Sequence, residues 1–194
     1  MWTIPNILTL LRILLIPVFV LIFYLPFEGA RVLSAAVFAL ASVTDWLDGY
    51  LARRWQQVSP FGAFLDPVAD KLMVAAALLL LVEAEPSPAL ALPAAIIVGR
   101  EITISALREW MAEIGARAQV AVSMIGKFKT AVQMVAILLL IIKQPLWEIP
   151  VFTVGFVLLY VSAILTLWSM VVYLRAAWPS LSGQSVVEVL PREE

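Results

Sequence analysis

Long apolar segments alternate with short breaks along most of the chain. A helix needs about 20 residues to cross the roughly 30 Å hydrocarbon core of a bilayer. Six segments approach that length: Ile7–Tyr24, Val32–Arg53, Phe64–Val82, Ala89–Leu107, Ala121–Ile142 and Ile149–Leu174. Proline or glycine lies in the breaks between them, where helices commonly end. The pattern therefore predicts an all-α integral membrane protein with six transmembrane helices.

Composition supports a membrane protein. The 194 residues are 63% hydrophobic and 14% charged, whereas soluble domains are about 45–50% apolar and about 25% charged. The mean hydropathy is +0.99. One soluble core cannot bury so much apolar surface, so we expect lipid to cover much of it. We expect a single membrane domain over residues 1–176 and a polar tail over residues 177–194.

The placement of Lys and Arg predicts the orientation, because cytoplasmic ends of membrane helices carry an excess of both. If both termini lie in the cytoplasm, 11 of the 13 Lys and Arg residues lie at or towards the inner side, and only Arg31 and Lys143 lie outside. We therefore expect both termini, and with them the polar tail, on the cytoplasmic side.

Charge and residue usage exclude several kinds of site. The net charge is −1, so no basic field favours nucleic acid. The chain contains no cysteine and no histidine, which excludes thiol nucleophiles, thiolate metal sites and imidazole chemistry. Carboxylates, Lys, Arg, Tyr and hydroxyl groups remain as candidates for chemistry.

Four aspartates lie where ionised groups are costly and usually functional, near the predicted cytoplasmic ends of the second and third helices. They are Asp45, Asp48, Asp66 and Asp70. At about 100° per residue, Asp45, Asp48 and Gly49 fall within an arc of about 100°. By the same geometry Gly62, Asp66 and Asp70 share one stripe of the next helix. A short loop joins the two helices, so we expect the two acidic stripes to face each other.

Four converging carboxylates repel one another unless some protonate or bind a cation. Carboxylate oxygens suit hard ions such as Mg²⁺ or Mn²⁺. Two such ions would balance four charges and suit phosphorus chemistry. Two other interpretations stay open: pairing with Arg53, Arg54 or Lys71 that only stabilises helix packing, or a path for cation transport. The clustering of the acids at one membrane face, rather than at the midplane, weakens the transport hypothesis.

The run around these acids resembles a known signature. Asp45-Trp-Leu-Asp48-Gly49-Tyr-Leu-Ala52-Arg53 is followed by Gly62, Asp66 and Asp70. This run resembles the signature of the CDP-alcohol phosphotransferase family, with every position filled. The resemblance extends to Ile4–Thr9 with Arg12, Gly99–Ile102, Ala106–Met111 and Gly126–Thr130. The last three segments resemble bacterial members that act on glycerol 3-phosphate in particular.

The resemblance implies an activity and a site. It implies that a phosphatidyl group passes from CDP-diacylglycerol to glycerol 3-phosphate, with release of CMP. The enzyme would be a homodimer in the bacterial cytoplasmic (inner) membrane, with its site facing the cytoplasm. The resemblance also implies that Asp45, Asp48, Asp66 and Asp70 hold Mg²⁺ or Mn²⁺ and that Asp70 doubles as the base. Gly49, Arg53 and Ser59 would contact CDP-diacylglycerol, with Asn6 and Thr9 as weaker candidates.

Basic residues at the same membrane face are candidates for binding the acceptor's phosphate. Arg100 and Arg108 lie two turns apart on a broadly common side of the fourth predicted helix, and Lys127 and Lys129 begin the fifth. The alternative is that they are ordinary flanking charges, with Glu101 as an ion-pair partner of Arg100. Other acceptors of the same family, namely phosphatidylglycerol, serine or inositol phosphate, also stay open.

Overall fold

The computed structural model describes residues 3–55, 59–114, 124–144 and 150–181. These residues form six α-helices in chain order: α1 (Ile4–Phe23), α2 (Ala30–Arg54), α3 (Pro60–Ala84), α4 (Pro88–Glu113), α5 (Met124–Ile142) and α6 (Val151–Leu181). The six apolar segments of the sequence thus correspond to six helices, and the all-α prediction is confirmed. The last helix continues five residues past the domain boundary expected at 176, and residues 182–194 lie outside the described part.

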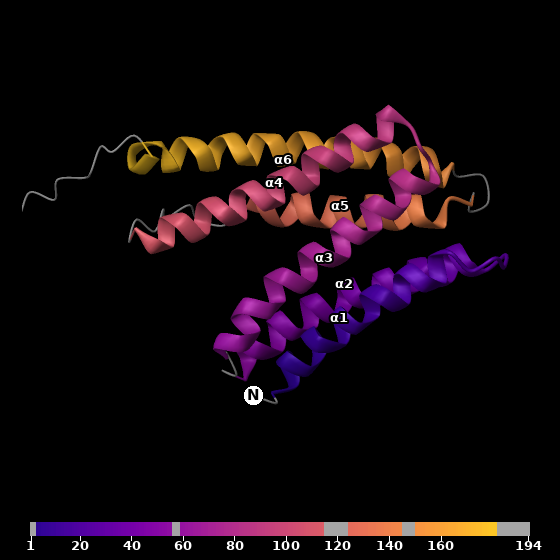
Figure 1. The fold of residues 1–194 in the computed structure, drawn as a ribbon, viewed down its shortest axis with the longest axis horizontal. Coiled ribbons are helices and arrows are strands. Elements are labelled where there is room, and N and C mark those ends of the chain that lie inside the picture. The colour runs from indigo at the N-terminus through magenta and orange to yellow at the C-terminus, as the bar shows by residue number, and fades with distance from the viewer. Residues whose placement is uncertain (1–2, 56–58, 115–123, 145–149, 182–194) are drawn as a thin grey trace, which may run out of the picture.

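The helices form two groups of three (Figure 1). α1, α2 and α3 pack on one another, and in the second group α6 packs on both α4 and α5, while α2–α5, α3–α4 and α3–α5 contacts join the groups. Successive helices run in opposite directions. The start of α1, the end of α2 and the start of α3 therefore lie at the same end of the molecule as the end of α4. Residues far apart in the sequence meet at this end.

Proline lies in the first turn of three helices, α1, α3 and α4. Ser59 caps α3, where its Oγ accepts a hydrogen bond from the Gly62 backbone N–H at 3.0 Å, and Pro60 follows it. Ser87 caps α4 in the same way ahead of Pro88. Proline suits the first helical turn because its missing N–H would have no partner there. The helices therefore start earlier than the apolar runs predicted.

The apolar core lies in the half of the bundle away from the aspartates. It includes Phe19 of α1, Phe38 of α2, Leu78 of α3, Ile97 of α4 and Ile137 of α5, all fully buried or nearly so. On α3 the core residues begin at Met73, after the last of the aspartates. The opposite half of the bundle is thus left for polar groups.

Apolar side chains also cover the outside of the protein. Large exposed hydrophobic residues occur on all six helices, as expected of a surface that faces lipid. By length and composition, α1, residues 30–51 of α2, α4 and residues 151–178 of α6 can each cross a membrane. α3 carries three charged residues in its first half, and the apolar part of α5 that is described is short, Phe128–Ile142. The chain is therefore a multi-pass membrane protein.

Candidate active site

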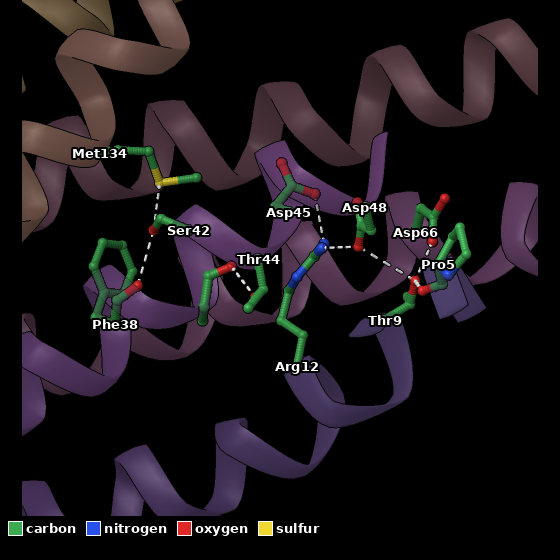
Figure 2. Close-up of polar contacts among 11 residues, drawn as sticks. Pro5, Thr9, Arg12, Phe38, Ser42, Thr44, Asp45, Asp48, Asp66 and Met134 are labelled. Carbon is green, nitrogen blue, oxygen red and sulfur yellow. Dashed lines mark hydrogen bonds and ion pairs between the residues drawn. The ribbon is translucent and has the colours of Figure 1, made fainter. Parts of the chain in front are cut away.

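Arg12 of α1 lies between two aspartates of α2, as Figure 2 shows. Its Nη1 donates to Asp45 Oδ1 at 2.5 Å, and its Nη2 donates to Asp48 Oδ2. The guanidinium is buried, with 1% of the Arg12 side chain exposed. A guanidinium presents its donors in a rigid planar fork. α1 therefore supplies a cation that fixes the positions of two predicted site carboxylates.

Thr9, almost one turn before Arg12, brings the acidic stripes of α2 and α3 together (Figure 2). Its Oγ1 lies 2.5 Å from Asp66 Oδ1 and 3.4 Å from Asp48 Oδ2. The same oxygen lies 3.1 Å from the carbonyl oxygen of Pro5. A hydroxyl has one proton to donate, so it serves one of these acceptors at a time. The two stripes thus converge at a buried hydroxyl of α1.

Asn6 and Ser59 adjoin this cluster where α1 meets the start of α3. Ser59 Oγ donates to Asn6 Oδ1 at 3.0 Å. A Cβ atom on Gly62 would lie only 2.5 Å from Asn6 Oδ1, closer than real contacts allow. The absence of a side chain at Gly62 therefore lets α1 and α3 approach each other here. Three of the predicted donor-binding residues, Asn6, Thr9 and Ser59, lie beside the aspartates.

Asp70 follows Asp66 by one turn of α3. Its charge interacts with those of Asp45 and Arg12 in the acidic cluster, and with those of Glu101 and Lys71. Asp70 therefore lies within electrostatic range of the acidic cluster and of Glu101, which belongs to a second group of charges on α4 and α5.

This second group is a partly buried ionic cluster of Arg100, Glu101 and Lys129. Glu101 Oε1 accepts from Arg100 Nη1 at 3.0 Å and from Lys129 Nζ at 3.0 Å. Arg100 Nη2 also donates to Ser169 Oγ of α6 at 2.9 Å. The Nε of Arg100 is buried and has no partner among the described residues. Two cations share one carboxylate, so the cluster has an excess positive charge and a spare donor, both suited to an anion.

A cavity between α3 and α4 leads to this cluster. Its volume is about 190 Å³, and it is lined by Lys71, Leu72, Val74, Ala75, Val98, Glu101 and Ile102. Lys71 donates to Ser105 Oγ, which donates in turn to the backbone carbonyl of Glu101 at 2.6 Å. The cavity is therefore apolar except near Lys71 and Glu101, and Lys71 directly follows Asp70 in the sequence.

The structure brings together part of the predicted set. All four aspartates lie at one end of the bundle, and two of the predicted acceptor residues, Arg100 and Lys129, share Glu101. Arg108 is exposed and forms no ion pair with a described residue. The side chains of Arg53 and Lys127 lie outside what the structure describes, and Gly49 directly follows Asp48 on α2. The roles of these residues stay predictions.

The sequence predicted no site role for Arg12, and for Glu101 it predicted only an ion pair with Arg100. A signal existed for Arg12, since a charged residue interrupts the apolar segment between Leu11 and Ile13 and such charges are costly in a membrane. Its two carboxylate partners come from another helix. Only the packing of α1 against α2 identifies them.

The carboxylates of the four aspartates can be compared with the ligands that a divalent metal ion needs. Among the described residues, no three carboxylates are grouped as ligands of a single ion. Within the described ranges Arg12 is the cation bonded to this acidic cluster, through Asp45 and Asp48, so the cluster keeps three negative charges uncompensated when all four aspartates are ionised. Hard carboxylate oxygens with excess negative charge suit a divalent cation. The residues therefore fit such an ion in charge and in chemistry.

Comparison with known proteins gives matches over most of the chain. A family model described as CDP-alcohol phosphatidyltransferase matches residues 2–168. A Salmonella typhimurium protein named CDP-diacylglycerol–glycerol-3-phosphate 3-phosphatidyltransferase is 55% identical over 183 residues, which is 94% of this chain and 99% of that protein. A Pseudomonas fluorescens protein of the same name is 54% identical over 187 residues, or 96% of this chain and 95% of that protein.

Proposed function

The chain belongs to the CDP-alcohol phosphatidyltransferase family, and on that basis we propose that it transfers the phosphatidyl group of CDP-diacylglycerol to glycerol 3-phosphate. The products are phosphatidylglycerophosphate and CMP. The observation that carries this proposal is the 54–55% identity, over nearly the whole length, to proteins named for this donor and this acceptor. The acidic cluster on α2 and α3, and the pair of cations that share Glu101, are consistent with a metal-bound pyrophosphate and an acceptor phosphate.

The acidic cluster is the proposed site of metal and pyrophosphate. Asp45, Asp48, Asp66 and Asp70 would hold Mg²⁺ or Mn²⁺, with two ions as the expected number. Two divalent ions and Arg12 together offset four carboxylates and one charge of the pyrophosphate. Metal ions held by these carboxylates would supply positive charge to offset the negative charge that develops on the pyrophosphate oxygens.

Side chains beside the aspartates are proposed to bind the CDP part of the donor. Asn6, Thr9 and Ser59 supply the polar atoms that adjoin the cluster. Gly49, which has no side chain and follows Asp48 on α2, and Arg53, one helical turn further on, are proposed to contact the donor as well. These groups orient the donor so that its lipid-side phosphorus faces the acceptor.

Asp70 is the proposed base. The acceptor's hydroxyl oxygen attacks the lipid-side phosphorus in line with the leaving group, and the new P–O bond forms there. The bond from that phosphorus to the bridging oxygen breaks, and CMP leaves with the electron pair. The hydroxyl proton passes to the Asp70 carboxylate. Since the chain has no histidine, a carboxylate is the suitable base, and general-base catalysis contributes about 10²–10⁴-fold.

The basic cluster is the proposed site of the acceptor's own phosphate. Arg100 and Lys129 carry the positive excess there, and charge-assisted hydrogen bonds to phosphate are the strong ones. Arg108 and Lys127 are proposed to add charge at the same membrane face. An acceptor without a phosphate, such as serine, would leave this charge unused.

The site is proposed to face the cytoplasm. The excess of Lys and Arg at this end of the molecule supports six transmembrane helices with both termini inside. Bacterial relatives support the cytoplasmic membrane as the location, and a homodimer is the expected assembly. The lipid donor would then reach the site through the bilayer, and the water-soluble acceptor from the cytoplasm.

Purified protein incubated with CDP-diacylglycerol, Mn²⁺ and a panel of acceptors tests the proposal. We expect CMP release with glycerol 3-phosphate and much less with phosphatidylglycerol, serine or inositol phosphate. Preference for another acceptor would keep the family chemistry and contradict the proposed acceptor. A cation transporter, the alternative of a different class, would release no CMP with any of them.

A further inference from the structure

We propose that Glu101 is a positioning residue, which holds Lys129 and Arg100 in place for the acceptor's phosphate. This inference rests on the proposed function, which puts the phosphate of glycerol 3-phosphate at these two cations. Glu101 itself would not touch the reacting atoms. It would act through the two cations, and its contribution would be to acceptor binding alone.

The geometry places one carboxylate oxygen between two helices. Glu101 Oε1 accepts from Arg100 of its own helix and from Lys129 of α5, each at 3.0 Å. Only 5% of the Lys129 side chain is exposed, against 27% of the Glu101 side chain. Lys129 is thus a buried cation whose place relative to Arg100 is set by the carboxylate that they share.

The pair keeps donors for a further anion. An ammonium group has three N–H donors and a guanidinium has five, and Glu101 takes one from each. The buried Nε of Arg100 has no partner within the described residues. Arg100 is also held from its other side by Ser169 Oγ at 2.9 Å. The cations are therefore fixed by Glu101 and Ser169 while retaining donors for phosphate.

Loss of Glu101 has two opposing effects. Removal of the carboxylate raises the net charge of the three side chains from +1 to +2, which by itself favours an incoming anion. Removal also leaves Lys129 buried without its partner, which is strongly unfavourable. The flexible four-carbon lysine side chain then turns away. We expect the lost position to outweigh the relieved repulsion.

The first test compares Glu101→Gln and Glu101→Asp with the wild-type enzyme. We expect Glu101→Gln to raise KM for glycerol 3-phosphate about 10-fold, the loss of roughly one charge-assisted bond. KM for CDP-diacylglycerol and kcat at saturating acceptor should change less than about 2-fold. Glu101→Asp keeps the negative charge on a side chain that is one methylene shorter, so we expect a smaller rise in KM for glycerol 3-phosphate. Glu113→Gln removes the same charge from the exposed end of α4 and serves as the matched control.

The second test is a double-mutant cycle with Lys129→Met. If Glu101 acts through Lys129, Glu101→Gln adds little to the KM of an enzyme that already carries Lys129→Met. Inhibition by inorganic phosphate, measured in the same variants, should weaken in parallel with the KM for glycerol 3-phosphate. Full additivity of the two substitutions would overturn the proposal.

Several further results would contradict the positioning role of Glu101 or the proposed function. An unchanged or lowered KM for glycerol 3-phosphate in Glu101→Gln would overturn the positioning role, as would an equal rise in KM for both substrates. If Glu101→Gln does not fold, as judged by thermal unfolding in detergent, the KM of Glu101→Asp decides in its place. A wild-type enzyme that releases no CMP with glycerol 3-phosphate would refute the proposed function itself, a result separate from any of these.

Discussion

At the scale of single residues, charge is paired unevenly in two places. The acidic cluster has four carboxylates and one bonded arginine, whereas the cluster on α4 and α5 has two cations and one carboxylate. Buried charges without full pairing are costly for folding. Such costs are tolerated where a ligand completes the pairing. The two excesses have opposite sign, which matches a metal-bound pyrophosphate on one side and a phosphate on the other.

Loss of one acidic ligand should affect metal binding first. We expect Asp45→Asn and Asp66→Asn each to weaken Mn²⁺ binding at least about 10-fold and to abolish turnover, because each removes a hard anionic oxygen. Mn²⁺ titration by calorimetry and CMP release measure the two effects, with the exposed Glu109→Gln as control. Excess metal should restore little activity. Near-normal activity of either variant at low metal would contradict a shared metal site.

Binding and chemistry should separate at Asp70. Asp70→Asn keeps the size of the side chain and a neutral oxygen but cannot accept the hydroxyl proton. We expect the variant to bind CDP-diacylglycerol with metal and yet to transfer at least about 10²-fold more slowly. Calorimetry of donor binding and CMP release on one preparation test this. If Asp70 is only a metal ligand, affinity and rate should fall together, and saturating Mn²⁺ should restore more than about a tenth of the wild-type rate.

The residues of the site were predictable to different degrees. The four aspartates could be found because ionised groups in a membrane helix are exceptional and because helical periodicity places them on facing stripes. The bonds from Arg12 to Asp45 and Asp48 could not, since they depend on how α1 packs against α2. The same holds for Lys129, whose pairing with Glu101 joins α5 to α4.

At the scale of helices, α1 organises the acidic end of the bundle. Its successive turns contribute Asn6, Thr9 and Arg12, which contact the start of α3, then Asp66, then Asp45 and Asp48. Apolar segment lengths predicted the number of helices correctly. They missed the first turn of α3, because the Ser59 cap and Pro60 start that helix four residues before the predicted Phe64.

The close approach of α1 and α3 predicts different effects for two glycines. In Gly62→Ala the new Cβ would lie 2.5 Å from the buried Asn6 Oδ1, whereas at Gly99 nothing lies within 4 Å. We expect Gly62→Ala to cost about 1–3 kcal/mol of stability and to reduce activity, because Asn6 must move. Gly99→Ala should be neutral or slightly stabilising, since alanine favours a helix over glycine. Thermal unfolding in detergent measures both, and equal behaviour would contradict this packing.

At the scale of the whole molecule, the cysteine-free sequence allows a direct test of topology. Glu28 lies in the connection from α1 to α2, and Glu113 ends α4 at the opposite end of the bundle. We expect Glu28→Cys to react with a membrane-impermeant maleimide added to intact cells. Glu113→Cys should react only in inverted vesicles. The reverse pattern would contradict cytoplasmic termini and a cytoplasm-facing site.

The separation into two groups of three helices has a consequence for how such proteins diversify. The residues proposed to bind the donor and the metal lie on α1–α3, and those proposed for the acceptor lie on α4 and α5, with α2–α5, α3–α4 and α3–α5 contacts between the two groups. Selection for a new alcohol can therefore act on the second half of the gene while the first half stays constant. A chimera that carries α4–α6 of a homologue with a different acceptor preference should therefore take on the acceptor preference of that homologue.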